Sequence, residues 1–309
     1  MQGSPVRIGT RGSPLALAQA HEVRARLMAA HGGTEDDYPV VVFKTTGDMI
    51  LDRPLAEVGG KGLFTKELED ALIRRDIDLA VHSMKDMQTE LPPGLGIAAV
   101  LQREDVRDAF ISLKFRSLAE LPSGAKVGTS SLRREAQVRR ARPDLDVVGF
   151  RGNVQTRLRK LNEGVADATF LACAGLNRLG MADHITAAVE PDVMLPAVAQ
   201  GAIGIETRED DERTRNLLVP LNHETTAVCV TAERAFLKRL EGSCRTPIAG
   251  LAQLAADVLT FRGLLLTPDG RDHLDVAMTG AIRDAAAIGD DAGRRILADA
   301  GPHFFAKHA

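Results

Sequence analysis

Short apolar runs alternate with helical patterns through residues 6–207, and this alternation constrains the fold more than any other feature of the sequence. Apolar runs at 6–8, 40–43 and 77–81 predict strands, and segments such as 65–75 carry apolar residues at helical spacing. Strands that alternate with helices form βαβ units, in which the helices pack on the faces of a sheet. The sequence therefore predicts an α/β fold.

A second unit of the same kind begins near Val106, and the strand at 201–207 is expected to return to the first unit. The chain would thus cross from the first unit to the second and back again, and such a layout makes two lobes with a cleft between them. Beyond about residue 221 the pattern changes to a helix at 224–240, strands around a Pro268–Gly270 turn, and a last helix at 285–300. We predict domain 1 at residues 1–101 plus 201–219, domain 2 at 102–200, and a small α+β domain 3 at 220–309.

Several strand-to-helix junctions carry small polar residues beside arginine. Ser13 is a good helix N-cap and Pro14 suits the first helical position, so Arg11 and Ser13 lie where backbone N–H groups bind anions. The same arrangement recurs at 129–134 and at 151–153. These junctions predict an anion-binding surface.

The net charge of −3 argues against a dedicated nucleic-acid binder. Residues 131–160, however, contain nine basic and three acidic residues, a local field that attracts a polyanion. We interpret Arg142 and Arg159 as a solvated helix face, and the arginines at the junctions as ligand-binding residues. An arginine-rich RNA-binding enzyme is one alternative, and it predicts strongly salt-dependent RNA affinity.

Asp86 and Lys85 follow the strand at 77–81, at the end where open α/β sheets bind ligands. The alternative for Asp86 is an ordinary helix N-cap. The glycine loop before it lacks the spacing of a phosphate-binding P-loop, and we regard Lys61 as an optional anion contact.

The three cysteines form no CxxC pair, so neither a disulfide framework nor a zinc site is expected. Cys173 and Cys229 lie in apolar runs typical of core thiols. Cys244 lies in a polar loop before Arg245, whose charge favours the nucleophilic thiolate, and it is a candidate for covalent attachment. The N-terminus does not resemble a signal peptide and no apolar run could cross a bilayer, which favours a cytoplasmic protein without membrane contact.

Seven motifs occur in one order and span most of the chain: Thr10–Ala16, Val58–Phe64, Val81–Asp86, Gly128–Arg134, Arg151–Val154, Leu195–Gly201 and Leu240–Cys244. Together they resemble the porphobilinogen deaminase family, also called hydroxymethylbilane synthases. The last sixty or so residues match this family more loosely.

The resemblance implies a monomeric transferase of haem and tetrapyrrole biosynthesis, with three domains and two lobes like those of periplasmic binding proteins. It also implies a dipyrromethane cofactor joined by a thioether to Cys244. Porphobilinogen loses ammonia, the terminal pyrrole of the cofactor attacks the resulting azafulvene, and a proton is lost. After four additions hydrolysis releases linear hydroxymethylbilane, and no metal or nucleotide is needed.

The resemblance also assigns the site residues. Asp86 would stabilise the positive charge that develops as ammonia leaves, with a role in proton transfer. Arginine forks suit the acetate and propionate groups that every pyrrole carries. The cofactor contacts implied are Lys85, Asp86, Ser131, Arg133, Arg134, Arg151 and Gly152, and the substrate contacts are Arg11, Ser13, Lys61, Arg157 and Arg178.

Two positions depart from the family pattern. Glu57 stands where some relatives carry lysine, so no carboxylate contact is expected there, and Gln88 replaces an expected proline, which predicts a looser loop. The main alternative to the enzyme is a two-lobed, non-enzymatic binding protein for a small polyanion. That alternative gives Cys244 no role.

Overall fold

The structure, a computed structural model, describes residues 4–49, 62–240 and 246–306. It divides into two compact units, one of Met1–Glu104 with Gly201–Ala227 and the other of Asp105–Gln200 with Val228–Ala309. The chain therefore passes between the units more than once, as expected for two lobes built from discontinuous segments. The cleft expected between the lobes stays a prediction.

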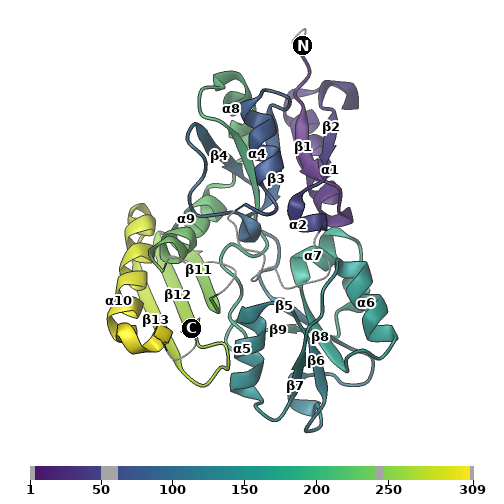
Figure 1. The fold of residues 1–309 in the computed structure, drawn as a ribbon. Coiled ribbons are helices and arrows are strands. Elements are labelled where there is room, and N and C mark those ends of the chain that lie inside the picture. The colour runs from purple at the N-terminus through teal and green to yellow at the C-terminus, as the bar shows by residue number, and fades with distance from the viewer. Residues whose placement is uncertain (1–3, 50–61, 241–245, 307–309) are drawn as a thin grey trace. The chain divides into compact units, whose positions relative to one another are not determined.

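The first unit is built on a five-stranded sheet in the order β2-β1-β3-β10-β4 (Figure 1). Its strands are β1 (Ile8–Arg11), β2 (Val40–Phe43), β3 (Leu79–Ser83), β4 (Leu95–Val100) and β10 (Ile203–Arg208). β1 pairs with β2 and β3 in parallel, whereas β10 is antiparallel to both β3 and β4. The expected return of the strand near 201–207 to the first unit is confirmed.

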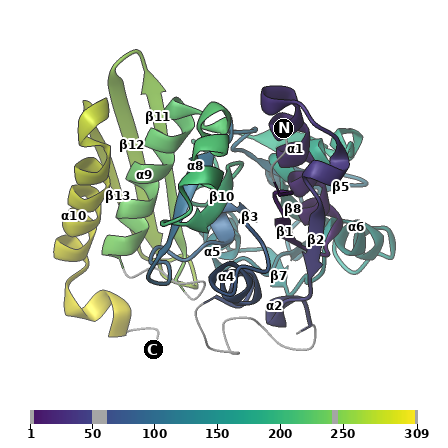
Figure 2. The same ribbon diagram turned by 90° about the horizontal axis from the view of Figure 1, so that it is seen from above.

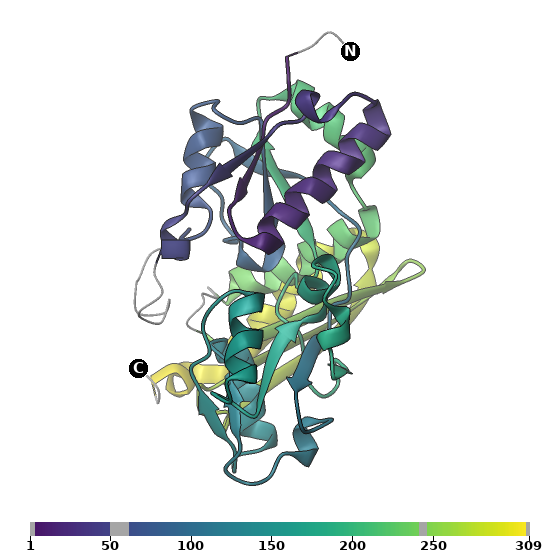
Figure 3. The ribbon, with the colours of Figure 1, turned by 90° about the vertical axis from the view of Figure 1, so that its right-hand side faces the viewer.

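Helices cover both faces of this sheet. The unit contains α1 (Pro14–His31), the short α2 (Thr46–Met49), α4 (Lys66–Ile73) and α8 (Glu212–Leu218), and residues of α1, α4 and α8 share apolar cores with the strands. Leu79 and Val81 share a core with α1, whereas Ala80 between them packs with α4, because successive strand residues point to opposite faces. Figure 3 shows α1, in purple, and α4, in blue, on opposite sides of these strands.

The second unit repeats this topology in a sheet of order β7-β6-β8-β5-β9. Its strands are β5 (Asp108–Ser112), β6 (Lys126–Gly128), β7 (Asp146–Val148), β8 (Ala168–Ala172) and β9 (Ala187–Val189), and its helices are α5 (Leu132–Ala141), α6 (Val154–Asn162) and α7 (Cys173–Arg178). Three strands are again parallel, and the fourth, β5, is antiparallel to both of its neighbours. The predicted α/β lobes are confirmed.

The C-terminal part is α+β, as predicted. β11 (Ile248–Ala255), β12 (Val258–Leu266) and β13 (His273–Ala281) form an antiparallel sheet, accompanied by α9 (Glu224–Arg239) and α10 (Ala285–Ala306) (Figure 2). Helix α10 is broken at Gly301, where φ is 59°, so its first segment ends at the expected residue 300 and a short second segment follows. Ala136 of α5 shares an apolar core with β11 and β12, which places both parts in one compact unit. The division into domains 2 and 3 stays a prediction.

Cys173 and Cys229 are buried free thiols, as their apolar surroundings predict. Burial raises the pKa of the Cys173 thiol to about 12, so it stays protonated and inert at neutral pH. None of the helices in the described ranges is long and apolar enough to span a bilayer.

Candidate functional site

A pocket in the first unit lies where β1 and β3 end and α1 begins. Its volume is about 60 Å³, enough for a carboxylate group and a few water molecules. Among its lining residues are Arg11, Ser13, Gln19, His82, Ser83 and Asp86. Three of the residues predicted for binding and catalysis, Arg11, Ser13 and Asp86, are therefore brought together by the fold.

The cationic side of this pocket is built by the start of α1. Ser13 is the N-cap: its Oγ accepts a hydrogen bond from the N–H of Ala16 at 3.3 Å. The Arg11 guanidinium lies 4.2 Å from the ring centroid of Phe64, a cation–π contact that fixes its position. A helix N-terminus beside a held guanidinium is suited to bind a carboxylate.

Asp86 ends a short 3-10 helix, Met84–Asp86, that follows β3 directly. The N-cap of this helix is Ser83, so the alternative interpretation of Asp86 as a helix N-cap is wrong. Lys85 and Asp86 are both exposed, and Ser83 is held by the Gln19 amide, which donates to its Oγ at 2.8 Å. The carboxylate is thus presented at the end of a buried strand.

Buried polar side chains lie in the same unit, and one of them, His82, lines the pocket together with Asp86. His82 Nε2 is 3.0 Å from Oε2 of Glu206, and the two side chains are almost completely buried. Burial raises the pKa of Glu69 on α4, whose carboxylate accepts a hydrogen bond from the Gln88 amide at 3.3 Å. Gln88, expected to loosen its loop, thus contacts a neighbouring helix. No role was predicted from the sequence for Glu206 or Glu69.

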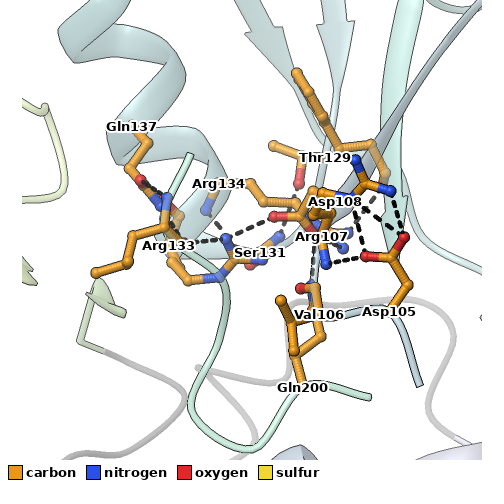
Figure 4. A network of polar contacts seen from close by, with 12 residues as sticks. Asp105, Val106, Arg107, Asp108, Thr129, Ser131, Arg133, Arg134, Gln137 and Gln200 are labelled. Atoms are coloured by element: carbon orange, nitrogen blue, oxygen red, sulfur yellow. Dashed lines mark hydrogen bonds and ion pairs between the residues drawn. The ribbon is translucent and has the colours of Figure 1, made fainter. Parts of the chain in front are cut away.

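The second unit holds Arg133 and Arg134 in the first turn of α5, where both are buried (Figure 4). Both guanidinium groups bind Asp108 at the start of β5: Arg133 Nη1 donates to Oδ2 at 2.7 Å, and Arg134 Nη2 donates to Oδ1 at 2.7 Å. Ser131 is the N-cap of α5, and its Oγ accepts a hydrogen bond from the N–H of Arg134 at 3.5 Å. The predicted ligand arginines are thus also members of a buried ion-pair network.

The pKa of Asp108 lies below its ordinary value. Burial alone would raise it, but the charges and hydrogen bonds of Arg133 and Arg134 outweigh burial and favour the carboxylate. A carboxyl group with a lowered pKa in the folded state stabilises the fold above its unfolded pKa of about 3.9. That contribution is lost as the pH falls through the folded-state pKa.

Asp108→Asn is expected to lower the free energy of unfolding by about 3 to 5 kcal/mol at pH 7, because two buried guanidinium groups lose their counterion. The deficit should shrink below a pH of about 3.9, because Asp108 of the unfolded chain then binds a proton that the folded protein does not, which removes the stabilising contribution of the carboxylate. Urea unfolding of both proteins across this pH range measures it. A deficit that does not change with pH would show that the carboxylate charge is not its cause.

The loop before α6 supplies Arg151 and Gly152. Asn153 is the N-cap of α6, and the side chains of Arg157 and Lys160 reach back to the loop, donating to the carbonyls of Gly152 at 2.8 Å and Arg151 at 3.0 Å. The structure thus groups three of the predicted ligand residues, Arg151, Gly152 and Arg157, in one turn. Arg178 is the last residue of α7 and is half-buried.

Gly152 adopts a φ of 128°, and a Cβ there would lie 2.5 Å from Thr156 Cγ2. Gly152→Ala is therefore expected to lower the free energy of unfolding by about 1 to 3 kcal/mol, through backbone strain and a steric clash. Gly149→Ala is the matched control, since no atom lies within 4 Å of its added Cβ. Thermal unfolding compares the two, and equal losses would contradict the strain argument.

The interpretation of Arg142 as solvated is wrong. Its guanidinium donates to the carbonyls of Leu118, Ala119 and Leu121 and to Asp144, because it follows the end of α5 and ties the preceding loop to it. Arg159 is exposed, as expected, and pairs with Glu163 one turn later. Lys61, Glu57 and Cys244 lie outside the described residues.

Asp108 was not predicted from the sequence to be part of this network. The available signal was its place directly before the apolar run Ala109–Ile111, because a carboxylate that opens a buried strand needs a cationic partner. The partner itself could not be identified, since Arg133 and Arg134 lie 25 and 26 positions further along the chain.

The network suits an anionic ligand such as a dipyrromethane carboxylate. Two guanidinium groups share one carboxylate, which leaves one positive charge in excess. Arg133 Nε is buried and has no hydrogen-bond partner among the described residues. A buried cationic donor in this state calls for a further acceptor.

Comparisons with known proteins agree with these observations. Residues 6–216 match the family described as "Porphobilinogen deaminase, dipyromethane cofactor binding domain", and residues 227–298 match "Porphobilinogen deaminase, C-terminal domain". The chain is 61% identical over 302 residues to the porphobilinogen deaminase of Paracoccus denitrificans, covering 98% of this chain and 96% of that protein.

Two solved structures show lower similarity. A putative methionine-binding lipoprotein of Bacillus subtilis is 14% identical, with 71% of this chain and 90% of that chain covered and a TM-score of 0.43. A periplasmic substrate-binding protein of an ABC transporter from Coxiella burnetii is 16% identical, with 70% and 91% covered and a TM-score of 0.43. The family matches, by contrast, extend over nearly the whole sequence, and the chain belongs to the porphobilinogen deaminase family.

Proposed function

We propose that this chain is a hydroxymethylbilane synthase: it condenses four porphobilinogen molecules with loss of ammonia and releases linear hydroxymethylbilane by hydrolysis. The observation that carries the proposal is the 61% identity to a porphobilinogen deaminase over 98% of the chain. The pocket that joins Asp86 to Arg11 and Ser13 supports it, because a carboxylate beside anion-binding groups suits a substrate with both an ammonium group and carboxylates.

In this proposal Arg11 and the start of α1 bind a substrate carboxylate and orient the pyrrole ring. Asp86 accepts a hydrogen bond from the pyrrole N–H and stabilises the positive charge that develops as ammonia leaves. The same carboxylate is placed to accept the proton released when the new carbon–carbon bond forms. Asp86 ends the 3-10 helix Met84–Asp86 directly after β3, so an ordered backbone positions it for the reaction.

The second unit would hold the covalent dipyrromethane, which supplies the nucleophilic pyrrole carbon when bound. Arg133 and Arg134 carry the excess positive charge that its carboxylates need, and Ser131 adds a hydroxyl at the start of α5. The loop of Arg151 and Gly152 and the side chains of Lys85, Arg157 and Arg178 would provide further contacts. Lys61 and the attachment residue Cys244 complete the proposed set.

The experiment that tests this function is incubation of the purified protein with porphobilinogen. The expected product cyclises spontaneously to a porphyrinogen, which is detected by its absorbance after oxidation to a porphyrin. One ammonia should be released for each porphobilinogen consumed. A binding protein for a small polyanion would retain porphobilinogen unchanged. We further propose that the enzyme works as a monomer in the cytoplasm. Sedimentation at working concentrations tests whether it is a monomer.

A further inference from the structure

We propose that Asp108 is a positioning residue for the bound dipyrromethane: it orients the guanidinium groups of Arg133 and Arg134 and sets the charge that they present. This inference rests on the proposed function. It assigns to Asp108 a part in loading the cofactor, in addition to the stability that any buried ion pair provides.

The Asp108 carboxylate accepts hydrogen bonds from three side chains (Figure 4). Oδ1 accepts from Arg134 Nε at 3.1 Å and Nη2 at 2.7 Å, and from the Gln200 amide at 3.0 Å. Oδ2 accepts from Arg133 Nη1 at 2.7 Å. The two bonds from Arg134 to one oxygen fix the plane of that guanidinium, and the bond to Oδ2 places the second one beside it.

Backbone carbonyls supply the remaining fixed points. Arg133 Nη1 also donates to the carbonyl of Leu195 at 2.8 Å, and Arg134 Nη1 donates to that of Phe170 at 2.8 Å. The Gln137 amide holds Leu195 from both sides, donating to its carbonyl at 3.0 Å and accepting from its N–H at 2.8 Å. These carbonyls each hold a single arginine, whereas the Asp108 carboxylate links the two arginines to each other.

The net charge of the network follows from the fact that Arg133 and Arg134 share the single carboxylate of Asp108. Asp108 is fully buried, and each arginine is more than nine-tenths buried, so little water screens them. One carboxylate neutralises one guanidinium, and the second positive charge remains together with the buried, unpartnered Arg133 Nε. The network is thus built to receive one further anionic group in a defined orientation.

The test compares Asp108→Asn, Asp108→Glu and the control Asp105→Asn with the unsubstituted protein. Asp105 lies three positions earlier and pairs with Arg107 at 2.7 Å in a partly exposed position, so its substitution removes a neighbouring carboxylate whose ion pair is with Arg107. The mass of each intact protein gives the fraction that carries a two-pyrrole adduct. Circular dichroism at the same temperature gives the fraction that is folded.

We expect the folded Asp108→Asn protein to carry about tenfold less adduct than the unsubstituted protein, because misoriented guanidinium groups no longer match the carboxylates. Asp105→Asn should load fully. If Asp108→Asn does not fold, Asp108→Glu provides the test of the positioning role. It keeps the negative charge but displaces it by about one methylene, so reduced loading of the folded protein is expected.

Full loading of whichever Asp108 variant folds would overturn the positioning role and leave Asp108 a purely structural residue. Reduced loading of Asp105→Asn to the same extent would overturn it as well, because the effect would then not be specific to the network. If the unsubstituted protein carries no adduct, the proposed function itself fails, so the two failures are distinguishable.

Discussion

Asparagine in place of Asp86 is expected to lower the turnover of porphobilinogen by about 10²- to 10³-fold, the range seen when one electrostatic stabiliser of a transition state is removed. Asparagine keeps the shape of the side chain and can still bond a pyrrole N–H, but it cannot oppose the positive charge that develops as ammonia leaves. Substrate binding through Arg11 and the start of α1 should persist. Steady-state kinetics should therefore show a large fall in kcat and a small change in KM.

The control for this substitution is Asp76→Asn in the same unit. Asp76 is an exposed carboxylate that pairs with Arg74 at 2.9 Å, and exposed pairs contribute about 1 kcal/mol or less. Its replacement should leave kcat unchanged. Near-normal turnover by Asp86→Asn would refute the assignment of Asp86 as the catalytic carboxylate.

Serine in place of Cys244 is expected to abolish both the covalent adduct and turnover. The thioether requires a sulfur nucleophile, and a serine hydroxyl at neutral pH is far less nucleophilic than a thiolate. Cys229→Ser is the control, since Cys229 is a buried thiol of the same unit. Intact mass and porphobilinogen turnover are measured on both variants.

A Cys244→Ser protein that still carries the adduct would place the attachment at another residue. Cys173 is a poor candidate, because burial raises its pKa to about 12 and keeps it in the thiol form. Loss of adduct in Cys229→Ser alone would likewise contradict the assignment.

Much of the fold follows from local sequence signals. The alternation of apolar runs with helical patterns predicts both α/β sheets, and Ser13 caps the helix that it precedes in the sequence. These predictions succeed because each depends on neighbouring residues. The last helix breaks at Gly301, whose φ of 59° is non-helical, directly after its expected end at residue 300.

The site is predicted only in part. The sequence places arginines at the starts of helices, and the structure finds them there. Their burial and their shared partner Asp108 depend on how β5 lies in the sheet beside β8, a pairing between distant segments. Arg142 shows the same limit, because a helical pattern cannot reveal that three carbonyls of an earlier loop surround its guanidinium. Local patterns locate charged residues, whereas tertiary contacts determine which of these residues form buried ion pairs and hydrogen bonds within the protein.

The mass of the intact, purified protein tests the central claim most directly. A hydroxymethylbilane synthase with a dipyrromethane on Cys244 should exceed its sequence mass of 33.2 kDa by one two-pyrrole adduct, and peptide mapping should place that adduct on Cys244. Protein that converts porphobilinogen to hydroxymethylbilane with Cys244 unmodified would contradict the account.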